Sequence, residues 1–97
     1  MPTYVTLMRF TDQGIRNIKE GPARLEAAKK AFQSAGAEMK AYYLGLGHYD
    51  AIAVIEGPSD EVAAKMALAI GAQGNVRTET MRVFNEAEYR KLVSGLP

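Results

Sequence analysis

The sequence contains no cysteine and no tryptophan, and it has a single histidine. Without cysteine the chain can form no disulfide framework, no thiolate metal site and no cysteine nucleophile. One histidine with no paired-carboxylate spacing makes no recognisable set of metal ligands. We therefore expect no metal site and no bound cofactor.

Long hydrophobic runs and an excess of one charge sign are lacking too. The longest apolar runs are short, such as residues 51–55, so we expect no membrane-spanning segment. The first residues show no basic region followed by an apolar stretch, so we expect no secretory signal and a cytoplasmic location. The formal net charge of +1 argues against bulk electrostatic binding to nucleic acid or to an anionic membrane.

The remaining composition is that of one small globular domain. The chain has 97 residues, of which 47% are hydrophobic and 24% charged. This length suits a single domain over residues 1–97, and the hydrophobic fraction is too high for a disordered chain. No linker, low-complexity tract or charge block divides it.

Periodicity and composition predict four strands and three helices. Runs rich in β-branched and aromatic residues predict the strands, which are Thr3–Phe10, Met39–Leu46, Tyr49–Glu56 and Val76–Phe84. Apolar residues at helical spacing predict the helices, which are Pro22–Ala35, a segment from Ser59 to about Gly71, and a segment that starts at Asn85. The polar segment Thr11–Gly21 is expected to be a long loop with at most one helical turn.

Turn and cap residues support these boundaries. Gly21 is expected to cap the first long helix, and Gly36 to end it in a left-handed conformation. Ser59 is a predicted helix cap, and Asn85 with Glu88 forms a capping-box pattern. The resulting order, β-α-β-β-α-β plus a C-terminal helix, predicts an α+β, ferredoxin-like fold. In that fold the antiparallel sheet has strand order 4-1-3-2 and both long helices on one face.

A two-residue turn at Gly47-His48 is predicted to join the two middle strands. Gly47 would then take the positive φ of a type II′ turn. This turn sets the register, with Leu44 opposite Ala51, Tyr42 opposite Ala53, Tyr43 opposite Ile52, Ala41 opposite Val54 and Met39 opposite Glu56.

The alternation of each strand assigns residues to the two faces of the sheet. The compact aliphatic residues are expected to face the helices; they are Val5, Leu7, Ile52, Val54, Met81 and Val83. The other face would carry Tyr4, Thr6, Met8, Phe10, Tyr42, Leu44, Leu46, Tyr49, Ala51, Ala53, Ile55, Thr78, Thr80, Arg82 and Phe84. Such a face is too apolar for a monomer, so a second copy is expected to cover it. The alternative is that the C-terminal helix folds back over it.

One end of the predicted sheet gathers polar residues. The segment Thr11–Gly21, the Gly47-His48 turn and the start of the last strand meet there, with Arg16, Lys19, His48 and Arg77 as sources of positive charge. The N-terminus of the helix at Pro22 points to the same end and favours an anion. We therefore expect a site for a small polar or anionic ligand.

The candidate site residues are few. Arg16, Lys19 and Arg77 are the expected cations, Asp50 is expected to accept hydrogen bonds that hold the neighbouring loop, and Tyr42 and Tyr49 are candidates to line a pocket. His48 and Asp50 are candidates for moving a proton, and their alternative roles are an exposed turn residue and a structural acceptor. The tyrosines have the alternative of packing in the core or an interface.

The chain resembles the GYD domain family over nearly its whole length. The resemblance rests on Met1–Lys19, Pro22 with Leu25–Ala28, Ala41–Leu44, Gly47–Asp50, and Gly74–Thr78 followed by Thr80. Gly47, Tyr49 and Asp50 match the name-giving motif, with His48 interposed at a position that looks variable. The resemblance implies a fold similar to the dimeric α/β-barrel group, whose members include cofactor-free monooxygenases and haem-binding proteins. It implies no particular reaction.

These observations favour a small homo-oligomeric binding protein. A cofactor-independent oxygenase or isomerase, with His48 or Asp50 moving a proton in a tyrosine-lined pocket, is the first alternative. An assembly module without a ligand is the second.

Overall fold

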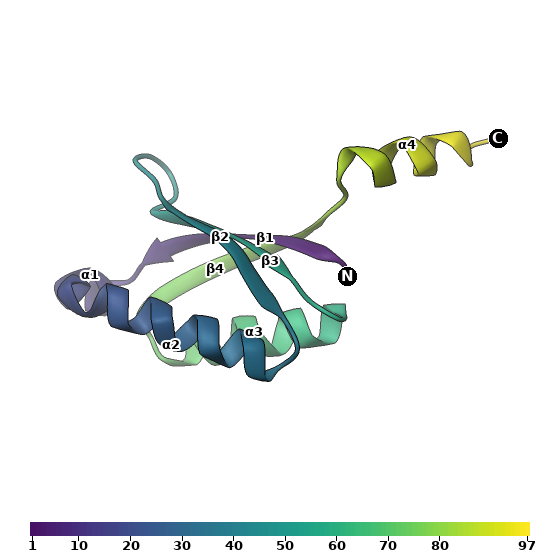
Figure 1. Ribbon diagram of the computed structural model, residues 1–97. Helices are drawn as coiled ribbons and strands as arrows, with labels where there is room; N and C mark the ends of the chain where they lie inside the picture. Colours follow the sequence, from purple (N-terminus) through teal and green to yellow (C-terminus); the bar gives the residue numbers. More distant parts are fainter.

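The computed structural model describes residues 1–97 and forms one four-stranded antiparallel sheet with helices (Figure 1). The elements are β1 (Thr3–Phe10), α1 (Asp12–Arg16), a short 3-10 helix η1 (Ile18–Glu20), α2 (Gly21–Ser34), β2 (Glu38–Leu44), β3 (Ala51–Glu56), α3 (Asp60–Ala72), β4 (Val76–Val83) and α4 (Glu86–Ser94). The strand order is β2-β3-β1-β4, which read from the β4 edge is 4-1-3-2. Helices α2 and α3 cover one face, and α4 projects away from the sheet.

Local signals explain where the helices begin and end. The Ser59 side chain accepts the Val62 N–H at the start of α3, and Asn85 with Glu88 completes a capping box at the start of α4. After α2, Gly36 has φ +82°, the left-handed conformation expected there. The cap of α2 differs from the expectation, because Glu20 stands at that position and Gly21 lies inside the helix.

The segment between β1 and α2 contains the one helical turn that the sequence allowed and also a 3-10 turn, so it is not a long loop. Residues 12–16 form α1 and residues 18–20 form η1. The Thr11 side chain caps α1 by accepting the Gly14 N–H at 3.0 Å, and its hydroxyl donates to the Gly74 carbonyl at 2.6 Å. The Thr11 N–H donates to the Asn75 carbonyl at 3.1 Å, so α1 is fixed to the loop before β4.

The hairpin between β2 and β3 has the expected central register but a different turn. Leu44 lies opposite Ala51 and Tyr42 opposite Ala53, as predicted. The connection is the six residues 45–50, not two, because β2 ends at Leu44 and β3 begins at Ala51. Only Gly36 and Gly74 have positive φ, so the predicted type II′ turn at Gly47 is wrong.

A second register difference lies at the other end of the hairpin. The pairing shifts between Met39 and Ala41, so Met39 lies opposite Ile55 and not opposite Glu56. A bulge of this kind adds one residue to one strand without a partner on the other.

The predicted assignment of the two sheet faces is wrong. Tyr4, Thr6, Ala51, Ala53 and Ile55 are buried beneath the helices. The alternate residues, which were expected there, form the uncovered face. The covered face includes the small side chains Ala51 and Ala53, which let the helices approach β3 closely.

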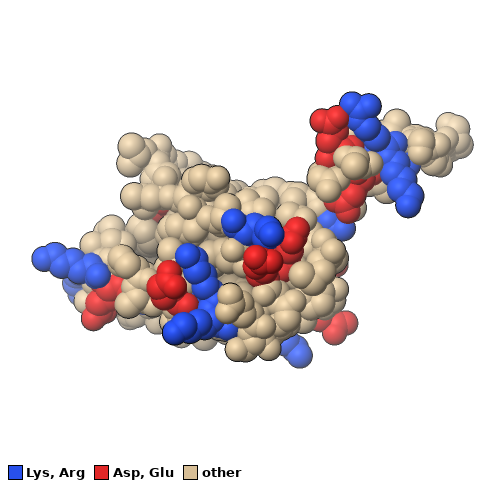
Figure 2. Space-filling model, viewed as in Figure 1, with Lys and Arg blue, Asp and Glu red and all other residues tan.

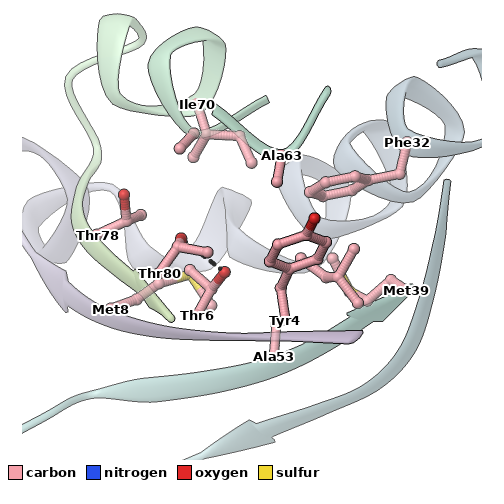
Figure 3. Close-up of a pocket in the computed structure, with 12 residues that line it drawn as sticks. Tyr4, Thr6, Met8, Phe32, Met39, Ala53, Ala63, Ile70, Thr78 and Thr80 are labelled. Atoms are coloured by element: carbon pink, nitrogen blue, oxygen red, sulfur yellow. Dashed lines mark hydrogen bonds between the residues drawn. The ribbon is translucent and has the colours of Figure 1, made fainter. Parts of the chain in front are cut away.

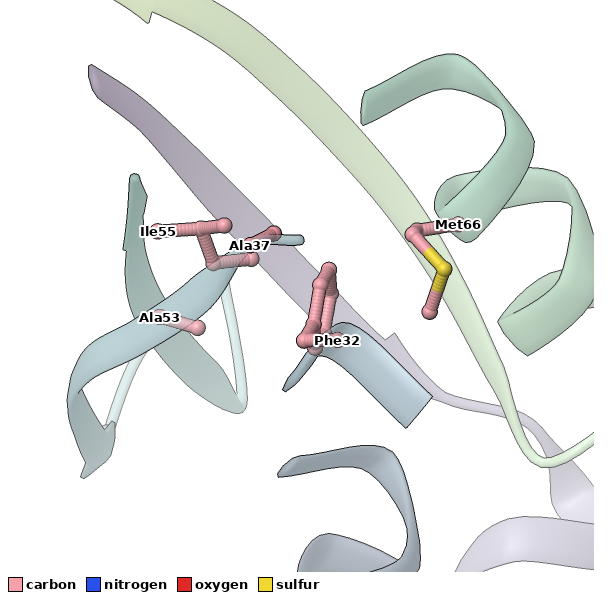
Figure 4. Packing of buried hydrophobic residues seen from close by; sticks show 5 residues of the cluster. All are labelled: Phe32, Ala37, Ala53, Ile55 and Met66. Atoms are coloured by element: carbon pink, nitrogen blue, oxygen red, sulfur yellow. The ribbon is translucent and has the colours of Figure 1, made fainter. Parts of the chain in front are cut away.

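The core lies between the sheet and the two long helices (Figure 4). Its buried members are Phe32, Ala37, Ala53, Ile55 and Met66. Phe32 of α2 is 3% exposed and Met66 of α3 is 9% exposed, so each helix contributes one large side chain. Burying such a side chain contributes about 1.5–3 kcal/mol.

None of the helices combines the length and the apolar character needed to span a lipid bilayer. Lys, Arg, Asp and Glu side chains lie over the helices and along α4, whereas the tip of the β2–β3 hairpin shows almost none (Figure 2).

Candidate functional site

The uncovered side of the sheet, here called the open face, is largely apolar. It is formed by the alternate residues of each strand, namely Thr3, Val5, Leu7, Arg9, Ala41, Tyr43, Ile52, Val54, Glu56, Arg77, Glu79, Met81 and Val83. Its apolar residues include Tyr43, which is 63% exposed, and Met81, which is 46% exposed. Val5 and Val54 are cross-strand partners near its centre. No other element of the chain covers it.

A polar hollow lies at one corner of the open face. Its volume is about 340 Å³, and it is lined by Leu7, Arg9, Tyr49, Arg77, Thr78 and Glu79. Strands β1 and β4 supply its floor, and the β2–β3 connection supplies Tyr49. This volume is within the range of small-molecule sites.

Two arginines stand side by side in the hollow. Arg9 of β1 and Arg77 of β4 are direct cross-strand partners. Neither guanidinium has a carboxylate oxygen within 4.0 Å, since neither takes part in any ion pair of the structure. Like charges directly opposite each other in a sheet are destabilising. The pair is therefore a concentration of positive charge and of N–H donors that has no ion-pair partner, although Glu79 also lines the hollow.

Tyr49 and its neighbours fix the Arg9 side chain. The guanidinium carbon lies 4.9 Å from the centre of the Tyr49 ring, and Nε donates to the His48 carbonyl at 3.1 Å. The Arg9 guanidinium also contacts the His48 ring. The Tyr49 hydroxyl donates to a Glu79 carboxylate oxygen at 2.8 Å. This hydrogen bond raises the pKa of Tyr49, and Arg9 opposes the shift.

Asp50 holds the end of β1, whereas the sequence predicted that it would hold the segment 11–21. Its carboxylate accepts the Phe10 N–H at 2.9 Å, and its own N–H donates to the Met8 carbonyl at 2.8 Å. His48 lies exposed in the same connection, 4.9 Å from the Tyr49 ring. Neither side chain lines the hollow.

The other predicted ligand residues lie elsewhere. Arg16 and Lys19 are exposed on α1 and η1 and do not line the hollow. Tyr42 packs against the core on the covered face, where burial raises its pKa and Arg24 opposes the shift. Of the predicted ligand set, the structure thus brings together Tyr49 and Arg77. Nothing in the sequence singles out Arg9 or Glu79, because one charged residue in a strand is typical of a solvated face.

A second cavity lies between the sheet and the helices (Figure 3). Tyr4, Phe32 and Met39 are among its mostly apolar lining residues. The only hydrogen bond between lining side chains joins the hydroxyls of Thr6 and Thr80 at 3.0 Å. The free volume is about 30 Å³, which is far below that of a metabolite site. Neither His48 nor Asp50 lines it, so the geometry does not assemble the tyrosine-lined proton-transfer pocket of the enzyme alternative.

Comparison with known proteins adds a family and a fold. The model of the GYD domain matches residues 4–93. A similar protein is the glutamine synthetase and cystathionine beta-lyase binding protein of Thermus thermophilus, which is 28% identical over 89 residues, or 91% of this chain and 94% of that protein.

Two solved structures share the fold at low sequence identity. The leucine response regulatory protein LrpA of Mycobacterium tuberculosis has a TM-score of 0.65 and 18% identity over 87% of this chain. The chain spans about half of that regulator, 51% of its length. TTHA0845 of Thermus thermophilus has a TM-score of 0.56 and 23% identity, with 88% of this chain and 95% of that protein covered.

Proposed function

Because the chain belongs to the GYD domain family, we propose that it is a small binding protein that works as a homodimer and holds a small polar or anionic ligand. The two subunits pack through their open faces, in the manner of a dimeric α/β barrel. The cysteine-free composition supports a cytoplasmic place of action.

The uncovered apolar sheet carries this proposal. Val5, Leu7, Ile52, Val54 and Val83 alternate along their strands with the residues buried beneath the helices. No helix covers their side of the sheet (Figure 1). Soluble monomers rarely expose a contiguous apolar patch of more than a few hundred Å². A second copy has the same face and covers it without a further partner.

The size of the face is suited to a dimer. Four strands of six to eight residues outline about 500 Å² at normal strand spacing and rise. Stable interfaces bury about 800 Å² on each partner. Two such faces together would bury about 1,000 Å², which is the lower limit for a specific interface.

Dimerisation is tested by placing a charge on the open face. Analytical ultracentrifugation of the wild type is expected to give twice the mass of the chain. Met81→Glu and Val54→Glu are expected to give folded monomers by circular dichroism, because the charge is left unpaired in an apolar contact. The matched control is Leu68→Glu, which replaces a 73% exposed apolar residue of α3 and is expected to stay dimeric. A wild type that is monomeric at micromolar concentration both with and without inorganic phosphate overturns the proposal.

Docking to another protein is a second candidate, favoured by α4. Tyr89, Leu92 and Val93 are 61%, 55% and 47% exposed on this projecting helix, and the Thermus relative is named for binding two enzymes. A tagged chain is mixed with purified glutamine synthetase and recovered. Complex formation that Leu92→Glu abolishes supports this candidate, and no complex with the wild type contradicts it.

The enzyme and assembly alternatives have less support. The proton-transfer candidates His48 and Asp50 engage Arg9 and the Phe10 N–H instead of facing a shared cavity. An assembly module without a ligand leaves the polar hollow with its two unpaired arginines unexplained.

A further inference from the structure

The arginine pair occupies the surface on which the second copy is proposed to dock. Arg9 and Arg77 lie on the same face as Leu7 and Met81. Bringing another copy over this corner removes water from two guanidinium groups that have no carboxylate within 4.0 Å. Removing water from unpaired charges opposes association. The hollow is therefore unfavourable in a dimer unless a negative group fills it.

The nearby carboxylate does not compensate the pair. Glu79 accepts the Tyr49 hydroxyl at 2.8 Å and forms no ion pair with either arginine. The formal charges of Arg9, Arg77 and Glu79 sum to one positive charge. The compensating anion must therefore come from outside this corner.

The geometry of the hollow suits a small oxyanion. The Arg9 guanidinium is held in place by the Tyr49 ring and the His48 carbonyl, and Arg77 stands opposite it. Forked guanidinium donors bind carboxylate and phosphate oxygens with two parallel hydrogen bonds. A volume of about 340 Å³ accommodates such a group with a small organic body.

We propose that the hollow binds a small oxyanion between Arg9 and Arg77, and that this binding strengthens dimerisation through the open face. This inference rests on the proposed dimer. It adds the class of ligand, the two arginines that bind it and its effect on dimerisation. Coupling is reciprocal, so the dimer also binds the anion more tightly than the monomer does.

The experiment measures the dimer dissociation constant by analytical ultracentrifugation in sodium chloride and in two probes, inorganic phosphate and malonate, at equal ionic strength. At equal ionic strength, a difference in the dissociation constant between the salts cannot come from general charge screening. At least one probe is expected to lower the dissociation constant on the order of tenfold. The probe that acts shows whether the natural group is a phosphate or a carboxylate.

Two variants identify the site. Arg77→Gln removes one charge of the pair, so it is expected to dimerise more tightly in chloride and to lose the response to the probe. Lys30→Gln removes one exposed positive charge from α2, outside the hollow, and is expected to respond like the wild type. Circular dichroism checks that both are folded.

The failures of the two proposals are distinguishable. A dimer whose dissociation constant is the same in all three salts overturns the anion site and leaves the dimer intact. A response that persists in Arg77→Gln, or probe binding to a monomer that does not associate, overturns the coupling. A chain that is monomeric in every salt overturns the dimer itself.

Discussion

The carboxylate of Asp50 accepts the backbone N–H of Phe10 at 2.9 Å, which joins the β2–β3 connection to the end of β1. A hydrogen bond to a charged group contributes about 1.5–3 kcal/mol when it is partly shielded from water. Asp50→Ala is expected to lower the free energy of unfolding by about 1–2 kcal/mol. Asp50→Asn keeps an acceptor oxygen and is expected to lose less. Urea unfolding measures both, and equal losses in the two variants would contradict the role of the acceptor.

Gly14 lies so close to the loop before β4 that no side chain fits. A Cβ at this position would be 1.9 Å from the Asn75 carbonyl oxygen, which is backbone and cannot move aside cheaply. Gly14→Ala is therefore expected to destabilise the fold by about 1–3 kcal/mol, although alanine is the better helix former.

The matched control for Gly14 is Gly71 in α3. No atom lies within 4 Å of the position that a Cβ would take there. Gly71→Ala is expected to stabilise the protein by about 0.5–1 kcal/mol through helix propensity. Thermal unfolding of the two variants should therefore shift in opposite directions. A Gly14→Ala protein as stable as the wild type would show that α1 does not pack as described.

The two turn glycines Gly36 and Gly47 should respond differently to the same substitution. Gly36 has φ +82°, whereas Gly47 does not have a positive φ, and a Cβ there meets nothing within 4 Å. Gly36→Ala is expected to lower the free energy of unfolding by about 1 kcal/mol, because residues with a side chain disfavour the left-handed conformation. Gly47→Ala is expected to change stability by less than about 0.5 kcal/mol. A large loss of unfolding free energy in Gly47→Ala, measured with denaturant, would contradict this and support the two-residue turn that the sequence suggested.

Tyr4 gives the stability a dependence on alkaline pH. Its pKa is raised above 10.0 by the hydrogen bond to Asp60, by burial and by the Asp60 charge, with Arg82 opposing. A raised pKa in the folded state means that the folded protein keeps a proton that the unfolded chain has lost. The contribution of Tyr4 is thus complete below the unfolded pKa of about 10 and decreases as the pH rises through the folded pKa.

Comparison with Tyr4→Phe isolates this effect from other alkaline titrations. The difference in unfolding free energy between the wild type and Tyr4→Phe is expected to be constant up to about pH 10 and to shrink above it. Asp60→Asn removes the charged acceptor, so the corresponding change should be smaller in that background. A difference that stays constant or grows at higher pH would contradict the raised pKa.

The succession of elements could be predicted from the sequence because local chemistry determines it. Ser59, Asn85 and Gly36 mark helix ends through bonds within a few residues, and the structure has each of them in the expected role. The sequence allowed one helical turn in the polar segment 11–21, but α1 and η1 could not both be predicted, because their packing depends on a distant partner. Thr11 and Gly14 pack on Gly74 and Asn75, which are about sixty residues away.

The sheet faces could not be assigned because both alternations are apolar. Tyr4 and Met8 alternate with Val5 and Leu7, so hydrophobicity alone does not say which set the helices cover. Size decides it, since Ala51 and Ala53 leave room for α2 and α3 to approach. The role of Arg9 could not be predicted for the same reason. It follows only from the pairing of β1 with β4, which places Arg77 opposite Arg9.

The projecting helix α4 is connected to the rest of the protein by few contacts. The capping box and the Glu86–Arg90 contact at 2.7 Å are internal to the helix, and the Arg82–Glu88 pair at 3.9 Å joins it to the sheet. Such a segment unfolds locally, at a much lower free energy than the core strands. Its backbone amides should then exchange with deuterated water early in an isolated chain. Slow amide exchange in α4 would therefore show, without any label, that another molecule is bound to this helix.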